Sequence, residues 1–156
     1  MGRWQERESD WPSQNSFCVK IHVYDQQKDL LVSKRSVRGL VNAVLEKEHY
    51  LEVSIYLVPE RKICHLHEKF FDDPSPTDCI SFPIDDEYLG EIFVCPKAAL
   101  KYDHHRPYEE LSLYVIHGIL HCLGFDDLEP KTRRVMRKKE KMCMALIKDR
   151  KLILGP

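Results

Sequence analysis

Apolar and polar residues alternate at period two in several segments, which predicts where the strands lie. In FCVKIHVY at 17–24 every second residue is apolar, as in a half-buried strand. Further strands are predicted in LEVSIYLV at 51–58 and LGEIFVC at 89–95. The shorter run CISFPI at 79–84 is expected to be an edge strand, because Pro83 cannot donate a ladder hydrogen bond.

Other segments carry apolar residues at helical spacing. Ser33 or Ser36 is expected to cap a helix, and the choice between them stays open. Its apolar stripe consists of Val37, Leu40, Val41, Val44 and Leu45. Spacing and prolines suited to first helical turns predict four more helices, at about 59–70, 97–102, 108–123 and 130–150.

Interleaved strands and helices predict an α/β or α+β domain built around one sheet. With 156 residues, 43% of them hydrophobic, the chain suits a single globular domain over residues 1–156. The polar residues 1–15 are expected to be poorly ordered. No apolar run approaches the roughly 18 residues of a membrane helix, so we expect a soluble, cytoplasmic protein with no membrane partner.

The net charge of -1 hides an uneven distribution of charge. Residues 131–151 contain ten Lys and Arg against two acids, whereas residues 68–91 contain eight acids against one lysine. A basic C-terminal end could dock on a phosphate backbone, although a charged run is also typical of a solvated helix face. Six cysteines form no CxxC pair and are expected to be small core residues.

Two histidines lie four residues apart in LYVIHGILHCLGFDD. His117 and His121 share one helix face, with Cβ atoms roughly 5–6 Å apart, so both imidazoles can reach one ion. The helix is apolar nearly all round, and an unpaired polar group buried there costs on the order of 1–3 kcal/mol. The pattern therefore favours a metal site over two separately hydrogen-bonded histidines.

A glycine brings a third ligand within reach. Gly124 is the residue type that ends a helix in the left-handed conformation and reverses the chain. The reversal can carry Asp126 or Asp127 back over His117 and His121, and both aspartates are within reach.

Two imidazoles and one carboxylate leave an open coordination position, as in catalytic zinc sites. Zinc can lower the pKa of bound water to about 7 and polarise a carbonyl or phosphoryl oxygen. Hydrolysis of a peptide or a phosphodiester is therefore expected, through a metal-bound water held by His117 and His121. The same ligand set binds Fe(II) in non-haem oxygenases, so Fe(II) or another divalent metal stays open.

The ligand spacing at 117, 121 and 127 equals that of the metzincin peptidases, whose motif places a general-base glutamate after the first histidine. Gly118 occupies that position. Glu110 lies roughly two helical turns from His117 and is a poor substitute. A metallopeptidase is therefore the less favoured prediction.

Three motifs in order, PTDCISFPID, LGEIFVCP and HGILHCLGFDD, strongly resemble the bacterial YbeY family of ribosomal RNA maturation endoribonucleases. The resemblance runs from about residue 50 to the C-terminus. It implies a zincin-like α+β fold in which one small mixed β-sheet of about four strands packs with about five helices. The metal site then lies on a buried helix. By position, His117 and His121 match the first two zinc ligands and Asp127 replaces a third histidine.

The activity that the resemblance implies is metal-dependent, single-strand-specific cleavage of RNA. It would serve maturation of the 16S rRNA 3′ end and ribosome quality control. The implied partners are rRNA and the small ribosomal subunit or its proteins, and the implied cofactor is one zinc ion.

The chain departs from the family pattern at positions that bear on activity. A carboxylate at Asp127 can bind zinc, at about 2.0–2.2 Å, but should make bound water less acidic. LHEKFFDDPSPTD resembles the family's LNxxYRGKDKPTD, with His67 at its asparagine, Phe71 at its arginine, and Asp72 and Asp73 at its Gly-Lys. Phenylalanine cannot make the bidentate phosphate contact of an arginine. The rival prediction is therefore a weakly active or inactive assembly factor that binds rRNA or ribosomal proteins.

Asp78, Ser81 and Phe82 keep the family's TDVLSFP pattern, on the strand expected to border the metal cleft. They are candidate substrate-contacting residues. In the alternative, Asp78 braces a turn and Phe82 packs in the interior.

Overall fold

A computed structural model describes residues 18–50 and 52–156 of the chain. The expectation that residues 1–15 are poorly ordered lies outside these described residues. Within these residues, four strands form one mixed sheet in the order β1-β2-β4-β3. Their bounds are β1 Lys20–Asp25, β2 Glu52–Leu57, β3 Cys79–Pro83 and β4 Tyr88–Val94.

Strand directions confirm the expected edge strand. β1, β2 and β4 run parallel, and β3 lies antiparallel to β4 at one edge of the sheet. Pro83 ends β3 opposite Gly90, where the missing N–H of proline interrupts no interior ladder. This edge strand forms one border of the site described below.

Five helices in the described part of the chain also lie close to their predicted ranges. They are α1 Lys34–Val44, α2 Glu60–Phe71, α3 Pro96–Tyr102, α4 Pro107–Cys122 and α5 Pro130–Asp149. Ser33 is the cap of α1, because its side chain accepts the Ser36 N–H at 3.2 Å. The interleaved order and the mixed sheet confirm an α+β fold.

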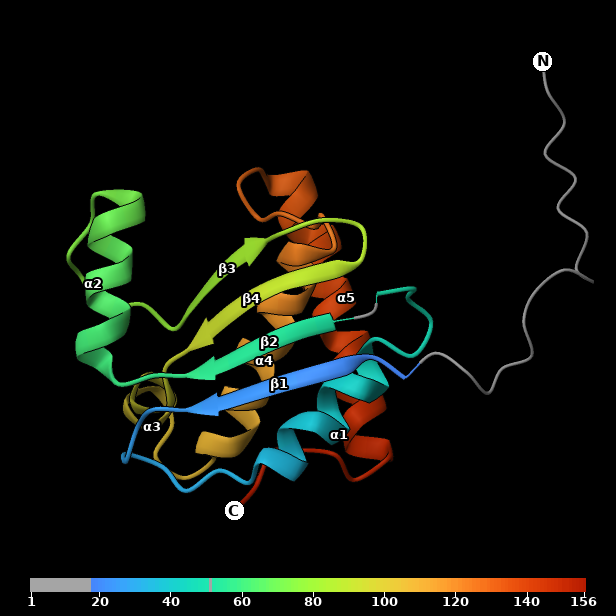
Figure 1. Ribbon diagram of the computed structural model, residues 1–156, viewed down its shortest axis with the longest axis horizontal. Coiled ribbons are helices and arrows are strands. Elements are labelled where there is room, and N and C mark those ends of the chain that lie inside the picture. Colours follow the sequence, from blue (N-terminus) through green and yellow to red (C-terminus); the bar gives the residue numbers. More distant parts are fainter. Residues whose placement is uncertain (1–17, 51) are drawn as a thin grey trace, which may run out of the picture.

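The two faces of the sheet are covered differently (Figure 1). α1 and α4 pack on one face, and α5 packs against both of these helices. The apolar side chains of α4, such as Val115, Ile116 and Ile119, are fully buried in the core between these layers. α4 is therefore held on several sides at once, which fixes the side chains that it presents.

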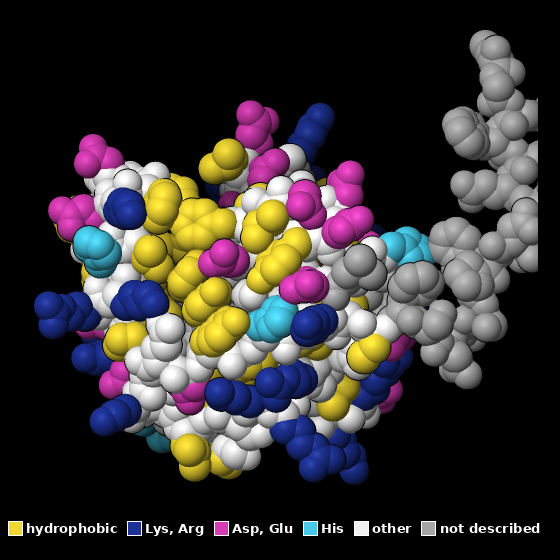
Figure 2. All heavy atoms as spheres, in the orientation of Figure 1, with side chains coloured by type: hydrophobic (Ala, Val, Ile, Leu, Met, Phe, Trp, Pro, Cys, Tyr) yellow, Lys and Arg dark blue, Asp and Glu magenta, His cyan; other side chains and the backbone are white. Residues whose placement is uncertain are grey.

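Aromatic rings cross the opposite face of the sheet. Tyr24, Tyr56 and Phe93 stack in a row, with ring centroids 4.8 and 4.5 Å apart. Figure 2 shows the hydrophobic side chains that gather on this face. α2 stands beside β3 at the edge of the sheet (Figure 1). None of the helices within residues 18–50 and 52–156 is both long and apolar enough to cross a bilayer.

Candidate metal centre and cleft

The chain reversal after α4 follows the prediction from Gly124. This glycine has a φ of +98°, in the left-handed region. Its N–H donates to the His121 carbonyl at 3.0 Å, and the Phe125 N–H donates to the Leu120 carbonyl at 3.0 Å. These two bonds form a Schellman motif, which satisfies the last carbonyls of the helix and turns the chain back.

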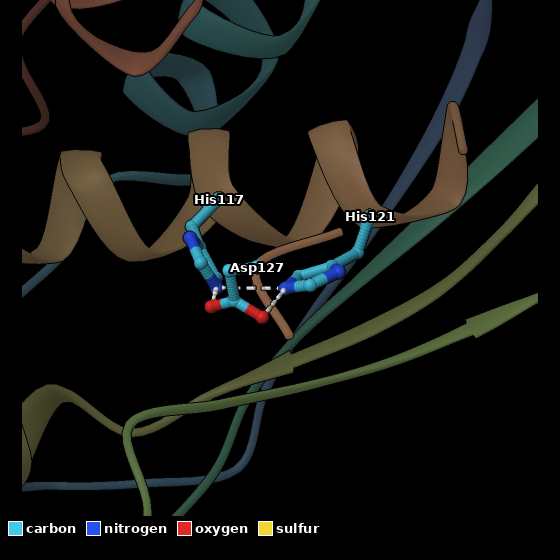
Figure 3. A group of neighbouring side chains, drawn as sticks. All are labelled: His117, His121 and Asp127. Atoms are coloured by element: carbon cyan, nitrogen blue, oxygen red, sulfur yellow. Dashed lines mark hydrogen bonds and ion pairs between the residues drawn. The ribbon is translucent and has the colours of Figure 1, made fainter. Parts of the chain in front are cut away.

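Three side chains meet beneath this turn (Figure 3). The Nε2 atoms of His117 and His121 lie 2.8 Å apart. The carboxylate of Asp127 places Oδ2 3.7 Å from Nε2 of His117 and Oδ1 3.8 Å from Nε2 of His121. One ligand atom from each residue lies within 4.8 Å of the others, so the group could hold a metal ion.

The separations within this group fit a divalent ion. Ligand atoms about 2.0–2.1 Å from a tetrahedral zinc lie roughly 3.3 Å from one another. The two Nε2 atoms lie 2.8 Å apart, and each lies 3.7 or 3.8 Å from a different oxygen of Asp127, so these distances are close to that value. Two imidazoles and a carboxylate are also the donors that zinc accepts, and all three side chains are partly buried.

The neighbouring residues Asp126 and Asp127 have different partners in the structure. Oδ1 of Asp126 accepts the Leu128 N–H at 3.2 Å. The Thr132 hydroxyl and this N–H hold the pKa of Asp126 below its usual value. Asp126 therefore braces the turn into α5, while the carboxylate beside the histidines is that of Asp127.

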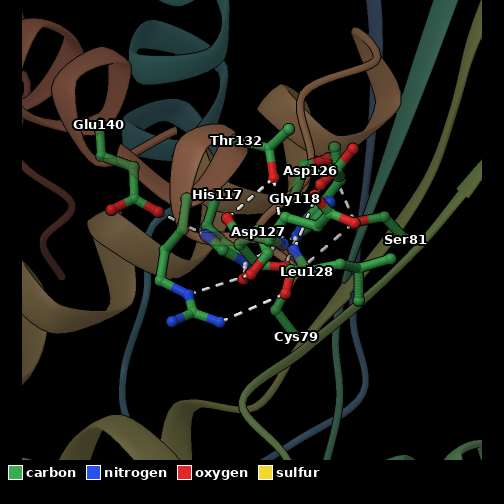
Figure 4. A network of polar contacts seen from close by, with 12 residues as sticks. Cys79, Ser81, His117, Gly118, Asp126, Asp127, Leu128, Thr132 and Glu140 are labelled. Atoms are coloured by element: carbon green, nitrogen blue, oxygen red, sulfur yellow. Dashed lines mark hydrogen bonds and ion pairs between the residues drawn. The ribbon is translucent and has the colours of Figure 1, made fainter. Parts of the chain in front are cut away.

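Glu140 of α5 holds His117 from behind (Figure 4). Its Oε1 lies 2.5 Å from Nδ1 of His117, and its side chain is 17% exposed. Because a carboxylate accepts, Nδ1 carries the proton and the Nε2 lone pair points toward His121 and Asp127. A carboxylate behind a histidine is the usual support of a metal-binding imidazole.

Sequence reasoning missed Glu140, although a signal was present. The residue is four positions after Met136 and three before Cys143, on the apolar stripe of the helix. An acid on an apolar stripe needs a buried partner. That requirement could have directed attention to a histidine.

Burial and the neighbouring imidazole affect the protonation of His121. Desolvation is the main cause that lowers the pKa of His121, and the nearby charge of His117 adds to it. The neutral imidazole is the form that binds a metal ion.

Gly118 lets α4 approach the sheet closely. A Cβ atom there would lie 2.5 Å from Cγ2 of Ile92 and 2.9 Å from Sγ of Cys79. The Ser81 hydroxyl donates to the Gly118 carbonyl at 3.1 Å across the same contact. No room exists here for the glutamate of a metzincin, so packing as well as sequence argues against that peptidase mechanism.

A cleft of about 370 Å³ opens beside the histidines. It is lined by His67, Phe71, Thr77, Cys79, Ile80, Ser81, Pro83, His117 and His121. Of the candidate substrate contacts, Ser81 is in this cleft. Phe82 instead packs on Phe70 and Phe93, with centroids 4.8 and 5.9 Å away, because neighbouring strand residues face opposite sides. Asp78 is exposed and precedes β3, outside the lining.

Comparison with known proteins decides the family. The family described as Endoribonuclease YbeY matches residues 22–148. An Endoribonuclease YbeY from Protochlamydia amoebophila is 42% identical over 147 residues, 87% of this chain and 98% of that protein. One from Chlamydia pneumoniae is 37% identical over 151 residues, 87% of this chain and 96% of that protein. This chain belongs to the YbeY family.

Membership of the YbeY family confirms the resemblance seen in the motifs and places the chain among nucleases that act on RNA. A solved structure supports the fold. The solution structure of TM1509 from Thermotoga maritima matches with a TM-score of 0.59 and 28% identity, over 81% of this chain and 88% of that one.

Apart from Asp127, the departures from the YbeY pattern gather at the C-terminal end of α2. His67 and Phe71 line the cleft, and Phe71 is 57% exposed. Asp72, which replaces a glycine of the pattern, caps α2 with φ 56° and ψ 35°. Glycine favours this left-handed conformation and aspartate tolerates it, so the turn keeps its shape despite the substitution.

Proposed function

We propose that this YbeY protein is a metal-dependent endoribonuclease specific for single-stranded RNA, acting in 16S rRNA 3′ end maturation and ribosome quality control. The observation that carries the proposal is the group of His117, His121 and Asp127 at the side of an open cleft. Its rRNA substrate and a partner on the small ribosomal subunit would place it in the cytoplasm. We treat residues 1–156 as one YbeY-like domain.

His117, His121 and Asp127 would hold one zinc ion. When bound, zinc supplies Lewis-acid chemistry, because it acidifies water and polarises a phosphoryl oxygen. Glu140 keeps Nε2 of His117 free to coordinate, since the carboxylate binds the proton-bearing Nδ1. The donor set also suits Fe(II). The identity of the bound metal is therefore measured directly in the experiment below.

Ser81 is the substrate-contacting candidate that the geometry supports. Its hydroxyl proton is used in the bond to the Gly118 carbonyl, so its oxygen can accept a hydrogen bond from a ligand in the cleft. A ribose 2′-hydroxyl is such a donor, and it distinguishes RNA from DNA.

The basic face of α5 is a second region suited to RNA. A hollow on this helix is lined by Pro130, Arg133, Arg134, Arg137, Lys138 and Lys141. Clustered guanidinium and ammonium groups bind phosphate backbones without sequence preference. We expect this face to dock rRNA or the small subunit.

One observation favours a rival function. No Lys or Arg is among the described residues that line the cleft, and Phe71 stands exposed at its edge. A weakly active or inactive assembly factor would bind rRNA or ribosomal proteins through α5 without cleaving RNA. Salt-sensitive RNA binding without metal-dependent cleavage would favour this rival.

The deciding experiment measures metal and cleavage in one preparation. The full chain is purified without a metal-binding tag, and bound metal is determined by mass spectrometry. Single-stranded and double-stranded rRNA fragments are then incubated with and without chelator. Stoichiometric zinc with chelator-sensitive cleavage of the single strand supports the enzyme. Metal without cleavage supports the assembly factor, and a protein that takes up no metal contradicts the proposed ligands.

A further inference from the structure

The cleft contains one further group that can carry a positive charge. Among the described residues that line it, only His67 can do so besides His117 and His121. Thr77 and Ser81 contribute uncharged hydroxyls. A phosphodiester is an anion, and its negative charge grows as a nucleophile adds to phosphorus. A cation on the wall opposite the metal group would therefore bind this substrate.

The surroundings of His67 orient its ring. Nδ1 lies 2.8 Å from the Ser75 carbonyl oxygen, which can only accept, so Nδ1 carries a proton. Nε2 is therefore the nitrogen that faces away from this bond, and it donates to a ligand when the ring is charged. The side chain is 20% exposed, so the ring is held in place with part of its edge open to the cleft.

Two side chains lie close to the His67 ring. Oδ2 of Asp73 lies 3.9 Å from Nε2, close enough to attract the charge but too far for a hydrogen bond. Hydrogen bonds from Ser75 lower the pKa of Asp73 and keep this carboxylate ionised. The Phe71 ring lies 5.7 Å from the His67 ring, within the range of a cation–π contact.

The geometry points to His67 as a substrate-binding residue whose protonated imidazole donates from Nε2 to a nonbridging oxygen of the RNA phosphodiester. The phosphate is then held between the α2 wall, which supplies His67, and the α4 wall, which supplies the metal group. This inference rests on the proposed function, since it names the contact by which the same cleft binds RNA.

His65 provides a matched control on the same helix. It lies two residues from His67 but lines a separate hollow with Pro59, Arg61, Lys62, Cys64, Glu68 and Pro74. Replacing His65 removes an imidazole from α2 but not from the cleft. The comparison therefore separates a general effect on the helix from an effect on the cleft.

The test compares the zinc-loaded wild-type chain with His67→Gln, His67→Lys and His65→Gln. Glutamine can still donate to the Ser75 carbonyl but carries no charge, whereas lysine restores a cation. Steady-state cleavage of a labelled single-stranded RNA gives KM and kcat, and metal content and circular dichroism are measured for each protein. We expect His67→Gln to raise KM about tenfold, as for the loss of a hydrogen bond to a charged group. His67→Lys should recover most of that loss, and His65→Gln should match the wild type.

Other outcomes overturn the inference. If His67→Gln cleaves like the wild type, the imidazole does not contact substrate. If His67→Lys is as impaired as His67→Gln with unchanged fold and metal, the charge is not what the site uses. Absence of cleavage by the zinc-loaded wild type would contradict the proposed function itself, and the inference with it.

Discussion

The two walls of the cleft differ in how they are built. On α4, Val115, Ile116 and Ile119 are fully buried, and the helix lies between the sheet and α5. On α2, Ile63 is fully buried, while Phe70 and Phe71 are 53% and 57% exposed. A helix enclosed by the core holds its polar groups in fixed positions, as a metal site requires. The exposed wall can change side chains at little cost in stability. Three departures of this chain from the family pattern lie on α2 or at its C-cap, at His67, Phe71 and Asp72.

This comparison predicts that substitutions on the α4 side change metal content or stability, while those on the α2 side change RNA binding. The largest expected effect is the loss of a ligand. Asp127→Ala should reduce bound metal from about one ion per chain to a small fraction. Cleavage should then fall by more than the roughly 100-fold that loss of an outer-shell partner can cause. Metal is measured by mass spectrometry and cleavage with single-stranded RNA.

Asp126→Ala is the control, because Asp126 binds Leu128 rather than facing the histidines. It should keep its metal. If Asp126→Ala loses metal and Asp127→Ala retains it, the assignment of the third ligand is wrong.

Crowding the α4 wall should destabilise the whole protein. Gly118→Ala would place a methyl group 2.5 Å from Cγ2 of the fully buried Ile92, so the free energy of unfolding should fall by about 1–3 kcal/mol. Gly39→Ala is the matched control, because Gly39 is also a helical glycine. A Cβ atom added there would lie 3.4 Å from its nearest neighbour, on Leu152. That variant should be neutral or up to about 1 kcal/mol more stable. Urea unfolding of the two proteins would contradict the packing argument if they proved equally stable.

Removing the support of His117 should weaken metal binding without abolishing it. Glu140→Ala should lower metal affinity about 10–100-fold, because the imidazole loses the partner that fixes its orientation. Competition with a calibrated chelator measures the affinity. Glu109→Ala, which removes a surface carboxylate paired with Lys148 at 3.5 Å, should leave the affinity unchanged. Equal affinities for all three proteins would show that Glu140 does not orient the ligand.

A basic residue on the α2 wall should strengthen RNA binding without changing the metal site. Phe71→Arg adds a guanidinium at a half-exposed position in the cleft lining, so RNA affinity should rise about 3–10-fold and its salt dependence should steepen by about one charge. Fluorescence anisotropy over a salt series measures both quantities. Leu31→Arg, at a residue 74% exposed and outside the cleft lining, adds the same charge elsewhere. An equal gain in RNA affinity for Leu31→Arg would show that the added net charge alone causes the effect.

The smallest effect is on pH stability. Burial and His117 lower the pKa of His121 from 6.5, so protonation favours the unfolded chain, in which the pKa is higher. The neutral His121 ring therefore contributes fully to the stability of the folded protein above about pH 6.5. This contribution is lost as the pH falls through the pKa of His121 in the folded protein. Thermal unfolding of metal-free protein from pH 7.5 to 5 should therefore show a smaller decline for His121→Gln than for the wild type. If the unfolding temperatures of the two proteins declined in parallel, protonation of His121 would not destabilise the folded protein.

Features decided by neighbouring residues were predictable from the sequence. Apolar periodicity located the strands and helices, Pro83 identified the edge strand, and Gly124 predicted the left-handed turn after α4. The spacing of His117 and His121 predicted that their rings meet, because residues four apart share a helix face. These features depend on backbone sterics and on hydrogen bonds within one or two helical turns.

Tertiary structure alone decided the rest of the site. Asp126 and Asp127 are adjacent, and only the path of the chain after Gly124 separates the one that braces the turn from the one beside the histidines. Glu140, 23 residues after His117, reaches it because α5 packs on α4. His67 enters the cleft because α2 stands beside β3. Such contacts join segments distant in sequence, and their geometry depends on how every element packs around the common core, which no local pattern encodes.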